Sequence, residues 1–527
     1  MESFRIKPIL GLKTNVPQND ASLFVGEACH CVDAQNVDSV RIKNAANKST
    51  GCAAYSSDVT SQHTKCTGLF ELRGSGGTDH LFWDNGKFYA LAADRSWTNV
   101  DAAVAVNFGT ADSALISAIQ VGDYVIMTDK AATLTPYKWK NGDANLTKFI
   151  ATGTAYKFRY LAPFQRRVFG AYSDQTNGDI EVRWTQAWTE SNYFASACTF
   201  AAANQLFKAG NDPISGIKPL GTNACILYGT DSISAIEYFA NYTTPFALKP
   251  VVNNHGTTGH HSIVDIGGTH YLFNKHYGFC AYAGGSAFPV GGRPISEPIE
   301  EIIASINPLY YVQIVGAFIP VSKEICWAVP INGAATPNCF LFYDMMTGNW
   351  RKKVLDSRYV DFWTLDTSLV WNDLSALGYL TWENFGLLSW SKFTSSIPIT
   401  VHANTDGHAY THTTEANATA AWSGYRIEPI LSLGDEKRSL LLEIWFSLAD
   451  VGDYTLNVYH RGGNTVGECE GANWIPLADV DCNSPSNAVT YCDKNFRFHQ
   501  IKWGTDAENE AFSVNAIQFN YVPQGAY

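Results

Sequence analysis

Apolar residues in this chain recur in short runs that are separated by turn-forming glycine, asparagine and aspartate. Residues 115–121 and 124–128 are two such runs, and only Gly122-Asp123 lies between them. A two-residue turn of this kind between apolar runs is the strongest local sign of a β-hairpin. The arrangement returns at residues 225–239 and 262–273. The pattern therefore predicts an all-β protein made of antiparallel hairpins.

The hairpins recur at long intervals. Their most apolar strands centre on Phe82, Val125, Val168, Ile226, Leu272, Cys326 and Leu380. A sheet of three or four strands, which these intervals allow, needs a neighbour on each side to bury both of its faces. Radial packing into a β-propeller supplies both neighbours. We predict a propeller of six or seven blades over residues 61–400, with a stack of unrelated β-sandwiches as the alternative.

Two regions flank this repeat. Histidine, threonine, asparagine and alanine fill residues 402–412, and longer alternating runs such as 439–448 follow. We expect a separate antiparallel β-sandwich over residues 401–527, because long alternating strands suit a sheet with one buried face. Residues 1–60 are polar and irregular, which predicts a segment that wraps the fold or contacts a partner.

One segment has the spacing of a helix. Between Pro294 and Pro308, isoleucines recur at 295, 299, 302, 303 and 306. Apolar positions three and four residues apart share one helix face, and the flanking prolines provide start and stop signals. The segment is expected to be a connecting helix that packs on the propeller rim.

Composition narrows the class of protein. The hydrophobic share of 46% and the aromatic share of 13% exclude a disordered chain. The net charge is −12, and lysine and arginine are scattered rather than clustered, unlike the basic patches that bind nucleic acid. The N-terminus lacks the apolar core of a secretory signal, and no run reaches the ~20 apolar residues of a membrane helix. We therefore expect synthesis in the cytoplasm and no membrane-spanning segment.

Cysteine and histidine offer the candidate metal ligands. Cys29-His30-Cys31 is the tightest group, but a second pair at zinc-site spacing is missing. Five histidines gather in one predicted blade, at positions 255, 260, 261, 270 and 276. Alternation along strands points such neighbours to opposite faces, so we predict no metal site. We expect the twelve cysteines to be reduced and apolar in role, with a disulfide among Cys469, Cys482 and Cys492 as the alternative.

The sequence contains no established catalytic motif. A GxSxG elbow, an HExxH pair and a phosphate-binding loop are all missing. Asp344, Thr347 and Trp350 have the spacing of a propeller turn in which the Asp binds turn amides and the Trp packs between blades, and Asp94 to Trp97 is a degenerate second copy. Glu300-Glu301 are neighbours on a helix and do not face one another. We therefore predict no catalytic residue, no cofactor-binding residue and no enzyme activity.

Several segments taken together resemble a known family. Residues 228–239 read Tyr-Gly-Thr-Asp-Ser-Ile-Ser-Ala-Ile-Glu-Tyr-Phe, and related motifs follow in order at 250–256, 261–273, 277–282 and 294–303. Further matches fall at 28–41, 180–184 and 189–193. This order resembles the β-propeller proteins of short-tailed bacteriophage tails, namely the tail nozzle (tail tubular protein B) and the packaged-DNA stabilisation proteins. The matching positions are packing and turn residues, so they imply a fold and no active site.

The resemblance implies a structural virion protein. Such a protein forms a homohexameric ring or tube, a nozzle or stopper, below the head-to-tail connector. It retains packaged DNA and lets it pass during ejection. Its expected partners are copies of itself, the connector or adaptor, and tail fibres or other tail proteins. Genomic DNA is expected to pass through the lumen without sequence-specific binding. Its expected location is the virion tail. An acidic wall would suit this role, because it makes few phosphate contacts.

Two other functions remain open on the sequence. A carbohydrate-binding propeller, such as a receptor-binding tail component or a lectin, would use exposed aromatic faces among the 15 Trp residues. A lectin propeller should repeat one Trp/Asp constellation in most blades, whereas only one or two copies occur here. A propeller glycosidase would need arginine or carboxylate side chains that converge in the central pocket.

Overall fold

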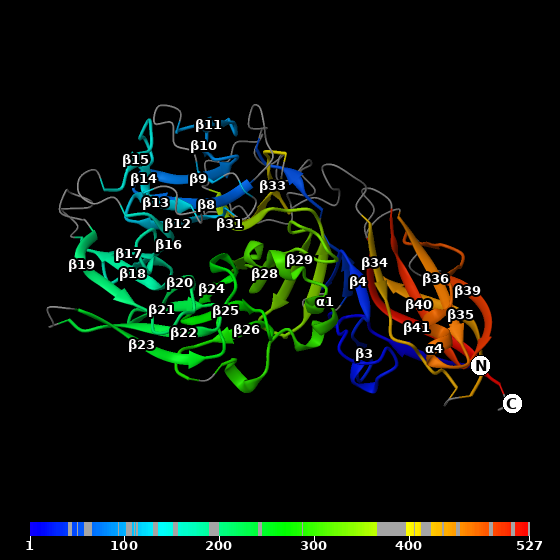
Figure 1. The fold of residues 1–527 in the computed structure, drawn as a ribbon. Coiled ribbons are helices and arrows are strands. Elements are labelled where there is room, and N and C mark those ends of the chain that lie inside the picture. The colour runs from blue at the N-terminus through cyan, green and yellow to red at the C-terminus, as the bar shows by residue number, and fades with distance from the viewer. Residues whose placement is uncertain are drawn as a thin grey trace.

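The computed structural model describes most of the chain. The description covers residues 1–527 apart from 41–44, 50, 57–65, 93, 102–107, 110, 112–113, 130–134, 151–155, 189–199, 241–244, 287, 366–396, 405, 413–422, 435–436, 450–453, 484–487, 507–511 and 525–527. Within it the chain is all-β, and two bodies of sheet lie side by side (Figure 1). The predicted fold class is confirmed.

The larger body is a β-propeller of seven small antiparallel sheets. Blade one consists of β8 (Cys66–Gly74), β9 (Gly77–Asp84), β10 (Lys87–Leu91) and β11 (Trp97–Asn99). Blade two consists of β12 (Ile116–Val121), β13 (Tyr124–Asp129), β14 (Tyr137–Lys140) and β15 (Thr147–Lys148). Blade three consists of β16 (Phe158–Phe164), β17 (Arg167–Ser173), β18 (Glu181–Thr185) and β19 (Phe200–Phe207). Blade four consists of β20 (Ile214–Leu220), β21 (Ala224–Gly229), β22 (Ser232–Tyr238) and β23 (Phe246–Asn253). Blade five consists of β24 (Val264–Ile266), β25 (Thr269–Asn274) and β26 (Gly278–Tyr282). Blade six consists of β27 (Val315–Ile319), β28 (Glu324–Val329), β29 (Cys339–Asp344) and β30 (Trp350–Val354).

Blade seven joins the two ends of the propeller. Its strands are β31 (Tyr359–Leu365), β32 (Ile397–Ala403), β33 (Ala409–Thr411) and β7 (Ala53–Ala54). The short β7 comes from the N-terminal region and pairs antiparallel with β33, with Ala54 opposite Tyr410. The inner strand β31 contacts the inner strand β8 of blade one. The ring is therefore closed by a strand that precedes the propeller in sequence.

Hydrophobic clusters between neighbouring blades hold the ring together. Trp83 of blade one and Val125 of blade two belong to one buried cluster, and the same sharing continues around the ring. Trp363 of blade seven and Phe82 of blade one complete it. Burial of apolar area stabilises at about 25 cal/mol per Å², so each sheet depends on the blades on both sides.

The repeat spacing located the blades. The predicted strand centres from Phe82 to Cys326 each lie in the second strand of blades one to six. Leu380, the last predicted centre, lies outside the described residues. Blade seven nevertheless follows blade six, which decides for seven over six.

The smaller body is a sandwich of two six-stranded sheets. One sheet has the order β39 (Val489–Phe496), β35 (Ser439–Leu448), β41 (Ser513–Pro523), β6 (Ala45–Lys48) and β5 (Val37–Val40), with β1 (Glu2–Ile6) also paired to β41. The other has the order β37 (Ile475–Pro476), β36 (Thr455–Gly463), β40 (Phe498–Thr505), β34 (Gly424–Ile427) and β4 (Asp33–Gln35), with β38 (Val480–Asp481) paired to β36. Helix α4 (Val466–Gly471) follows β36, and both chain ends lie at the sandwich (Figure 1).

This strand pairing corrects the predicted domain boundaries. The N-terminal region 1–60 is not an irregular segment, because four of its strands belong to the sandwich and β7 belongs to the propeller. It also carries η1 (Ala21–Leu23) and the hairpin of β2 (Phe24–Val25) and β3 (Ala28–Cys29). The predicted boundary at residue 400 falls inside β32, and blade seven extends to Thr411. Local polarity does not reveal a strand that pairs with a partner hundreds of residues away.

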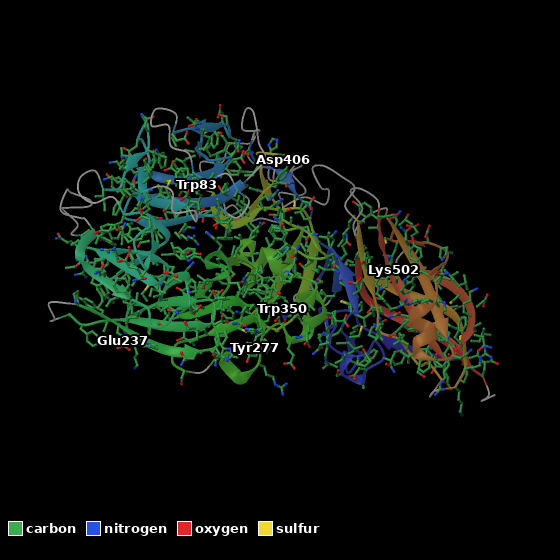
Figure 2. All side chains as sticks on the ribbon, viewed as in Figure 1. Trp83, Glu237, Tyr277, Trp350, Asp406 and Lys502 are labelled. Atoms are coloured by element: carbon green, nitrogen blue, oxygen red, sulfur yellow. The ribbon has the colours of Figure 1, made fainter. Side chains whose placement is uncertain are left out.

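The N-terminal region also runs along the outer strand of blade six. Leu12 N donates to Trp350 O at 2.8 Å, and Asn36 N donates to Lys352 O at 3.0 Å. Lys352 Nζ lies 2.8 Å from Asp33 Oδ1. Trp350, labelled within the propeller in Figure 2, is fully buried and shares one apolar cluster with the sandwich core. The two bodies are therefore continuous in packing.

A buried ion pair fixes the same region to the sandwich. Arg426 Nε lies 2.8 Å from Glu428 Oε1, and both side chains are buried. The two terminal nitrogens of Arg426 donate to the carbonyls of Leu10 and Cys29, each at 2.9 Å. Trp503 Nε1 donates to Glu428 at 2.9 Å. Removing one partner of such a pair costs about 3–5 kcal/mol, because the other charge stays buried.

The predicted connecting helix is shorter than expected. The segment after blade five forms η4 (Val290–Gly292), η5 (Glu297–Ile299), α1 (Glu300–Ala304) and η6 (Pro308–Gln313). Ile299 and Ile306 are buried in the apolar cluster that joins blades five and six to the sandwich. Two further short helices, η2 (Gly178–Ile180) and η3 (His260–Ser262), lie within the propeller. Among the described helices, none is long and apolar enough to span a bilayer.

Gly11 tests the contact between the N-terminal region and blade six. A Cβ at Gly11 would lie 2.3 Å from the carbonyl oxygen of Trp350, which is backbone and cannot move aside easily. We expect Gly11→Ala to lower the free energy of unfolding by about 1–3 kcal/mol, measured by urea denaturation. Gly467→Ala is the control, because a Cβ there meets nothing within 4 Å, and it should leave stability unchanged or slightly raised. Equal stability of the two variants would contradict the contact.

Candidate functional site

Residues of four blades and of η3 meet on the propeller axis. His260 of η3 lies 3.5 Å from Ser117 Oγ of blade two and accepts from Ile217 N of blade four at 3.3 Å. Its ring packs on Tyr160 of blade three, with centroids 5.0 Å apart. His261 lies 3.3 Å from the hydroxyl of Tyr359 in blade seven. Contacts across so many blades are possible only at the centre, so side chains fill the axis at this level.

Ionisable groups lie on the inner strands around this axis. Burial raises the pKa of Asp361 to about 7. Burial lowers the pKa of Lys218, and the charges of Asp265 and Asp361 oppose that shift. Asp361 accepts from its own neighbours, Phe362 N at 2.8 Å and Trp363 Nε1 at 3.2 Å.

Glu71 and Arg73 of blade one lie beside these groups. Glu71 pairs with Arg73, and both side chains bond Thr364 of blade seven. Perturbed pKa values at a convergence point can mark a reactive site, but they also arise in structural networks. Here Asp361 and Glu71 are each occupied by neighbouring groups, which is typical of a network that holds blades seven and one together.

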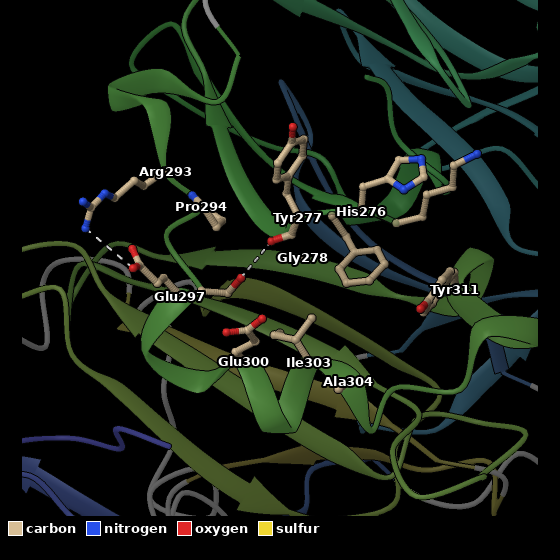
Figure 3. A pocket seen from close by; sticks show the side chains of 13 residues that line it. His276, Tyr277, Gly278, Arg293, Pro294, Glu297, Glu300, Ile303, Ala304 and Tyr311 are labelled. Carbon is tan, nitrogen blue, oxygen red and sulfur yellow. Dashed lines mark hydrogen bonds and ion pairs between the residues drawn. The ribbon is translucent and has the colours of Figure 1, made fainter. Parts of the chain in front are cut away.

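A pocket of about 460 Å³ opens on the propeller rim beside α1. Its walls combine aromatic and charged side chains, including Tyr277, Tyr311, Arg293, Glu297 and Glu300 (Figure 3). Arg293 and Glu297 lie 3.6 Å apart. Tyr277 is 38% exposed, and its ring packs against His255 and Phe288.

The wall of the rim pocket is held by the backbone. Ser296 Oγ accepts from Phe279 N at 3.0 Å, and the carbonyl of Tyr277 lies 3.4 Å from the same oxygen. Gly278 has a φ of 75°, and a Cβ there would lie 2.5 Å from Ser296 Oγ. The close approach of these two segments therefore requires glycine at position 278.

The two predicted Asp–Trp turns have structural geometry. Asp344 accepts from Met346 N and Thr347 Oγ1, both at 2.8 Å. Trp350 Nε1 donates to Ile295 O at 2.9 Å, and its ring packs on Trp327. In the second turn, Asp94 accepts from Ser96 N and Ser96 Oγ, and Trp97 stacks on Phe82 with centroids 5.1 Å apart. In both turns the Asp orders the loop. Trp350 is buried in the core, whereas Trp97 is partly buried and packs against the cluster between blades seven and one.

The five candidate histidines near blade five have different surroundings. Besides the axial His260 and His261, His270 lies 2.6 Å from the hydroxyl of Tyr228 and 2.7 Å from Pro219 O. His255 packs against Tyr277 and Phe288, and His276 lies near Asp231 at the surface. The rings of His260 and His261 contact each other, with centroids 5.2 Å apart, and His270 is the one histidine of the five that lies in a strand.

Cys29-His30-Cys31 does not form a shared ligand set either. Cys29 Sγ donates to Glu428 at 3.4 Å, whereas His30 Nδ1 lies 3.1 Å from Gly11 O. Cys31 is buried in the apolar cluster. All eleven cysteines of the described residues are buried and free, including the three for which a disulfide was the alternative.

The structure gathers one ligand set that the sequence analysis missed. Cys52, His402 and His412 place one sulfur and two ring nitrogens within 4.8 Å of one another. His402 and His412 both belong to the stretch 402–412 that stood out by composition. The missing signal was Cys52, which lies 350 residues earlier and reaches the histidines only through strand β7.

Comparisons with known proteins found only distant likenesses, all of them to solved structures. No family model matches the sequence, and no curated protein matches it. Solved structures with a similar shape include the extracellular domain of the one-component system BT4673 from B. thetaiotaomicron (TM-score 0.41, 9% identity, 80% of this chain and 47% of that one). Virginiamycin B lyase from Staphylococcus aureus has a TM-score of 0.38 at 8% identity, over 68% of this chain and 98% of that one. The Pan2 WD40 domain from Neurospora crassa has a TM-score of 0.34 at 7% identity, over 69% of this chain and 94% of that one. The chain thus spans about half the length of the BT4673 domain.

Two buried histidines in the sandwich form a polar chain. His499 Nε2 lies 3.1 Å from Phe496 O and 3.0 Å from Ser439 Oγ, and its Nδ1 lies 3.0 Å from His460 Nε2. Burial lowers the pKa of His460 to about 3 and that of His499 to about 4. Both rings are therefore neutral in the folded protein over the physiological pH range.

The two buried histidines predict that the sandwich loses stability in acid. The unfolded histidines titrate near pH 6.5, so below that pH the unfolded state binds more protons and stability falls as the pH drops toward 4. Between pH 6.5 and 4.5, we expect the free energy of unfolding of the His460→Gln variant to fall by about 2–3 kcal/mol less than that of the wild type. Urea denaturation at each pH measures this. His276→Gln, a change at an exposed ring, should keep the wild-type pH dependence. A His460→Gln variant with an unchanged pH dependence would contradict neutral burial.

Proposed function

We propose that this chain is a structural protein of a bacteriophage tail. Copies of it would form a ring or tube below the head-to-tail connector, retain packaged DNA and let it pass during ejection. The observation that carries the proposal is the order of family-like motifs in residues 228–303. These motifs fall on one continuous unit of the fold, from β21 of blade four through blade five to α1.

The construction of the fold favours a mechanical role. The N-terminal region pairs with strands of both bodies, and the cluster around Trp350 makes the packing continuous between them. A subunit of this kind behaves as one rigid wedge with two unlike ends. Repeated head-to-tail contacts between unlike surfaces close into a ring when the rotation per copy allows it.

The filled axis defines where DNA would pass. His260 and His261 occupy the centre of the propeller, so the channel for a duplex would lie between copies rather than inside one. A net charge of −12 disfavours tight phosphate contacts. Weak contacts suit a wall past which DNA must slide.

Electron microscopy of the purified full chain tests the assembly. We expect six-fold rings that dock end-on to the connector, since the interface joins identical copies. A chain that stays monomeric at high concentration and with the connector present would overturn the proposal.

A binding assay tests the character of the channel. We expect the assembled ring to bind duplex DNA no more tightly than about 10⁻⁶ M at physiological salt, because few cations are available to release counterions. Fluorescence anisotropy with a labelled duplex measures this. A much tighter, salt-sensitive complex would show a basic lumen and contradict the proposal that DNA slides past a weakly binding wall.

The rim pocket favours carbohydrate binding as a second candidate function. Tyr277 offers a partly exposed aromatic ring, and Glu297, Glu300 and Arg293 line the same hollow. Sugar rings stack on aromatic faces, and their hydroxyls bond carboxylates and guanidinium groups. On a tail protein, such a pocket would contact surface glycans of the host.

A glycan array decides on this candidate. Tyr277→Ala should weaken binding of any glycan that the wild type retains by about 10-fold, because a stacked ring is worth about 1–2 kcal/mol. Tyr491→Ala removes an exposed ring of the sandwich, outside the rim pocket, and should leave binding unchanged. No retained glycan, or equal loss in both variants, would exclude the rim pocket as a carbohydrate site.

A further inference from the structure

Strand register places Cys52, His402 and His412 on one face of blade seven. In the pairing of β7 with β33, Ala53 lies opposite Thr411, so Cys52 and His412 continue the same register. In the pairing of β32 with β33, His402 lies opposite Tyr410, two residues before His412. Residues two apart on a strand share a face, and diagonal neighbours are within reach of each other.

This face is turned toward blade six, with Cys52 and His402 buried and His412 partly buried. The ring of Phe340 in blade six lies 5.7 Å from that of His402 and 5.5 Å from that of His412. Cys52 is 1% exposed and His402 is 2% exposed. The two ring nitrogens, His402 Nδ1 and His412 Nε2, are 3.0 Å apart.

The donor set fits a transition metal. One thiolate and two imidazoles are ligands that Zn²⁺ prefers, and a fourth position can hold a small ligand such as water. The donors already converge, since all three atoms lie within 4.8 Å of one another. We propose that Cys52, His402 and His412 bind a divalent transition metal of the Zn²⁺ type, which fastens the N-terminal strand β7 to blade seven.

Lys353 of blade six is compatible with this site. Its Nζ lies 2.7 Å from His412 Nδ1, so without metal a hydrogen-bond chain runs from Lys353 through His412 to His402. Metal binding releases the thiol proton of Cys52 and the Nε2 proton of His412, while one proton moves from Lys353 to His412 Nδ1. A divalent ion, a thiolate and a neutral amine carry the same total charge as the ammonium, the thiol and the neutral rings before binding. The buried cluster therefore takes up the ion without adding net charge.

The site would stabilise the ring where it is closed. Between Cys52 and His402 the chain passes through six blades and into the seventh, and β7 pairs through only two residues. Fixing the ends of so long a loop in the folded state offsets part of its closure entropy. Because the ligands come from both ends of the propeller, metal binding is coupled to ring closure.

Metal titration of the full chain tests the inference. The protein is stripped with a chelator, kept reduced and titrated with Co²⁺ and then Zn²⁺. We expect one equivalent to bind, a thiolate-to-cobalt charge-transfer absorption that Zn²⁺ abolishes, and a higher Tm with Zn²⁺ than with chelator. Absence of stoichiometric binding, or of the charge-transfer absorption, in the wild-type protein would overturn the proposal whatever the variants do.

Matched variants locate the site. Cys52→Ala should remove the charge-transfer absorption. His402→Gln should weaken Zn²⁺ binding by at least about 10-fold, because mutating even a residue that only hydrogen-bonds a metal ligand typically lowers metal affinity by that much. Cys225→Ala changes an equally buried cysteine of blade four and should keep both the absorption and the affinity. Wild-type absorption in Cys52→Ala, or its loss in Cys225→Ala, would place the metal elsewhere and refute the assignment.

Discussion

The fold depends on strand pairing between the N-terminal region and segments hundreds of residues away. Each blade buries both faces only because it has neighbours, and among the described strands β7 is the one that pairs with β33 on the outer side of blade seven. Unpaired edges invite association with other chains. The same N-terminal region supplies strands β1, β4, β5 and β6 to the sandwich. One stretch of chain therefore closes the propeller, completes the sandwich and sets their relative position.

Buried polar groups follow the same logic. Arg426 and Glu428 lie in the sandwich core, yet their hydrogen bonds end on Leu10, Cys29 and Trp503. On the propeller axis, His260 and His261 link blades that are not neighbours. Such networks specify one arrangement, because a slip would leave a buried charge or donor without its partner.

Some features of the candidate sites could be predicted from the sequence, and others could not. The turn formed by Asp344 and Thr347 could be predicted, since its hydrogen bonds join residues close in sequence. His270 and His276 are separated because His270 lies within β25 and His276 lies in the turn that follows it. The rim pocket could not be predicted, because Tyr277 and Glu300 meet only once α1 packs beside blade five. The ligand set of Cys52, His402 and His412 depends on a strand of two residues, which carries no local pattern.

The sequence by itself determined the class of fold and the positions of six blades. Period-two alternation, two-residue turns and the interval between Phe82 and Cys326 are local properties, and the hydrophobic effect acts on them in the same way in any surroundings. Only the tertiary structure decided where the domains end, what the first 60 residues do and which ionisable groups meet. These features rest on contacts between residues far apart in the chain, such as Leu12 with Trp350, and one sequence shows each partner without showing the pair.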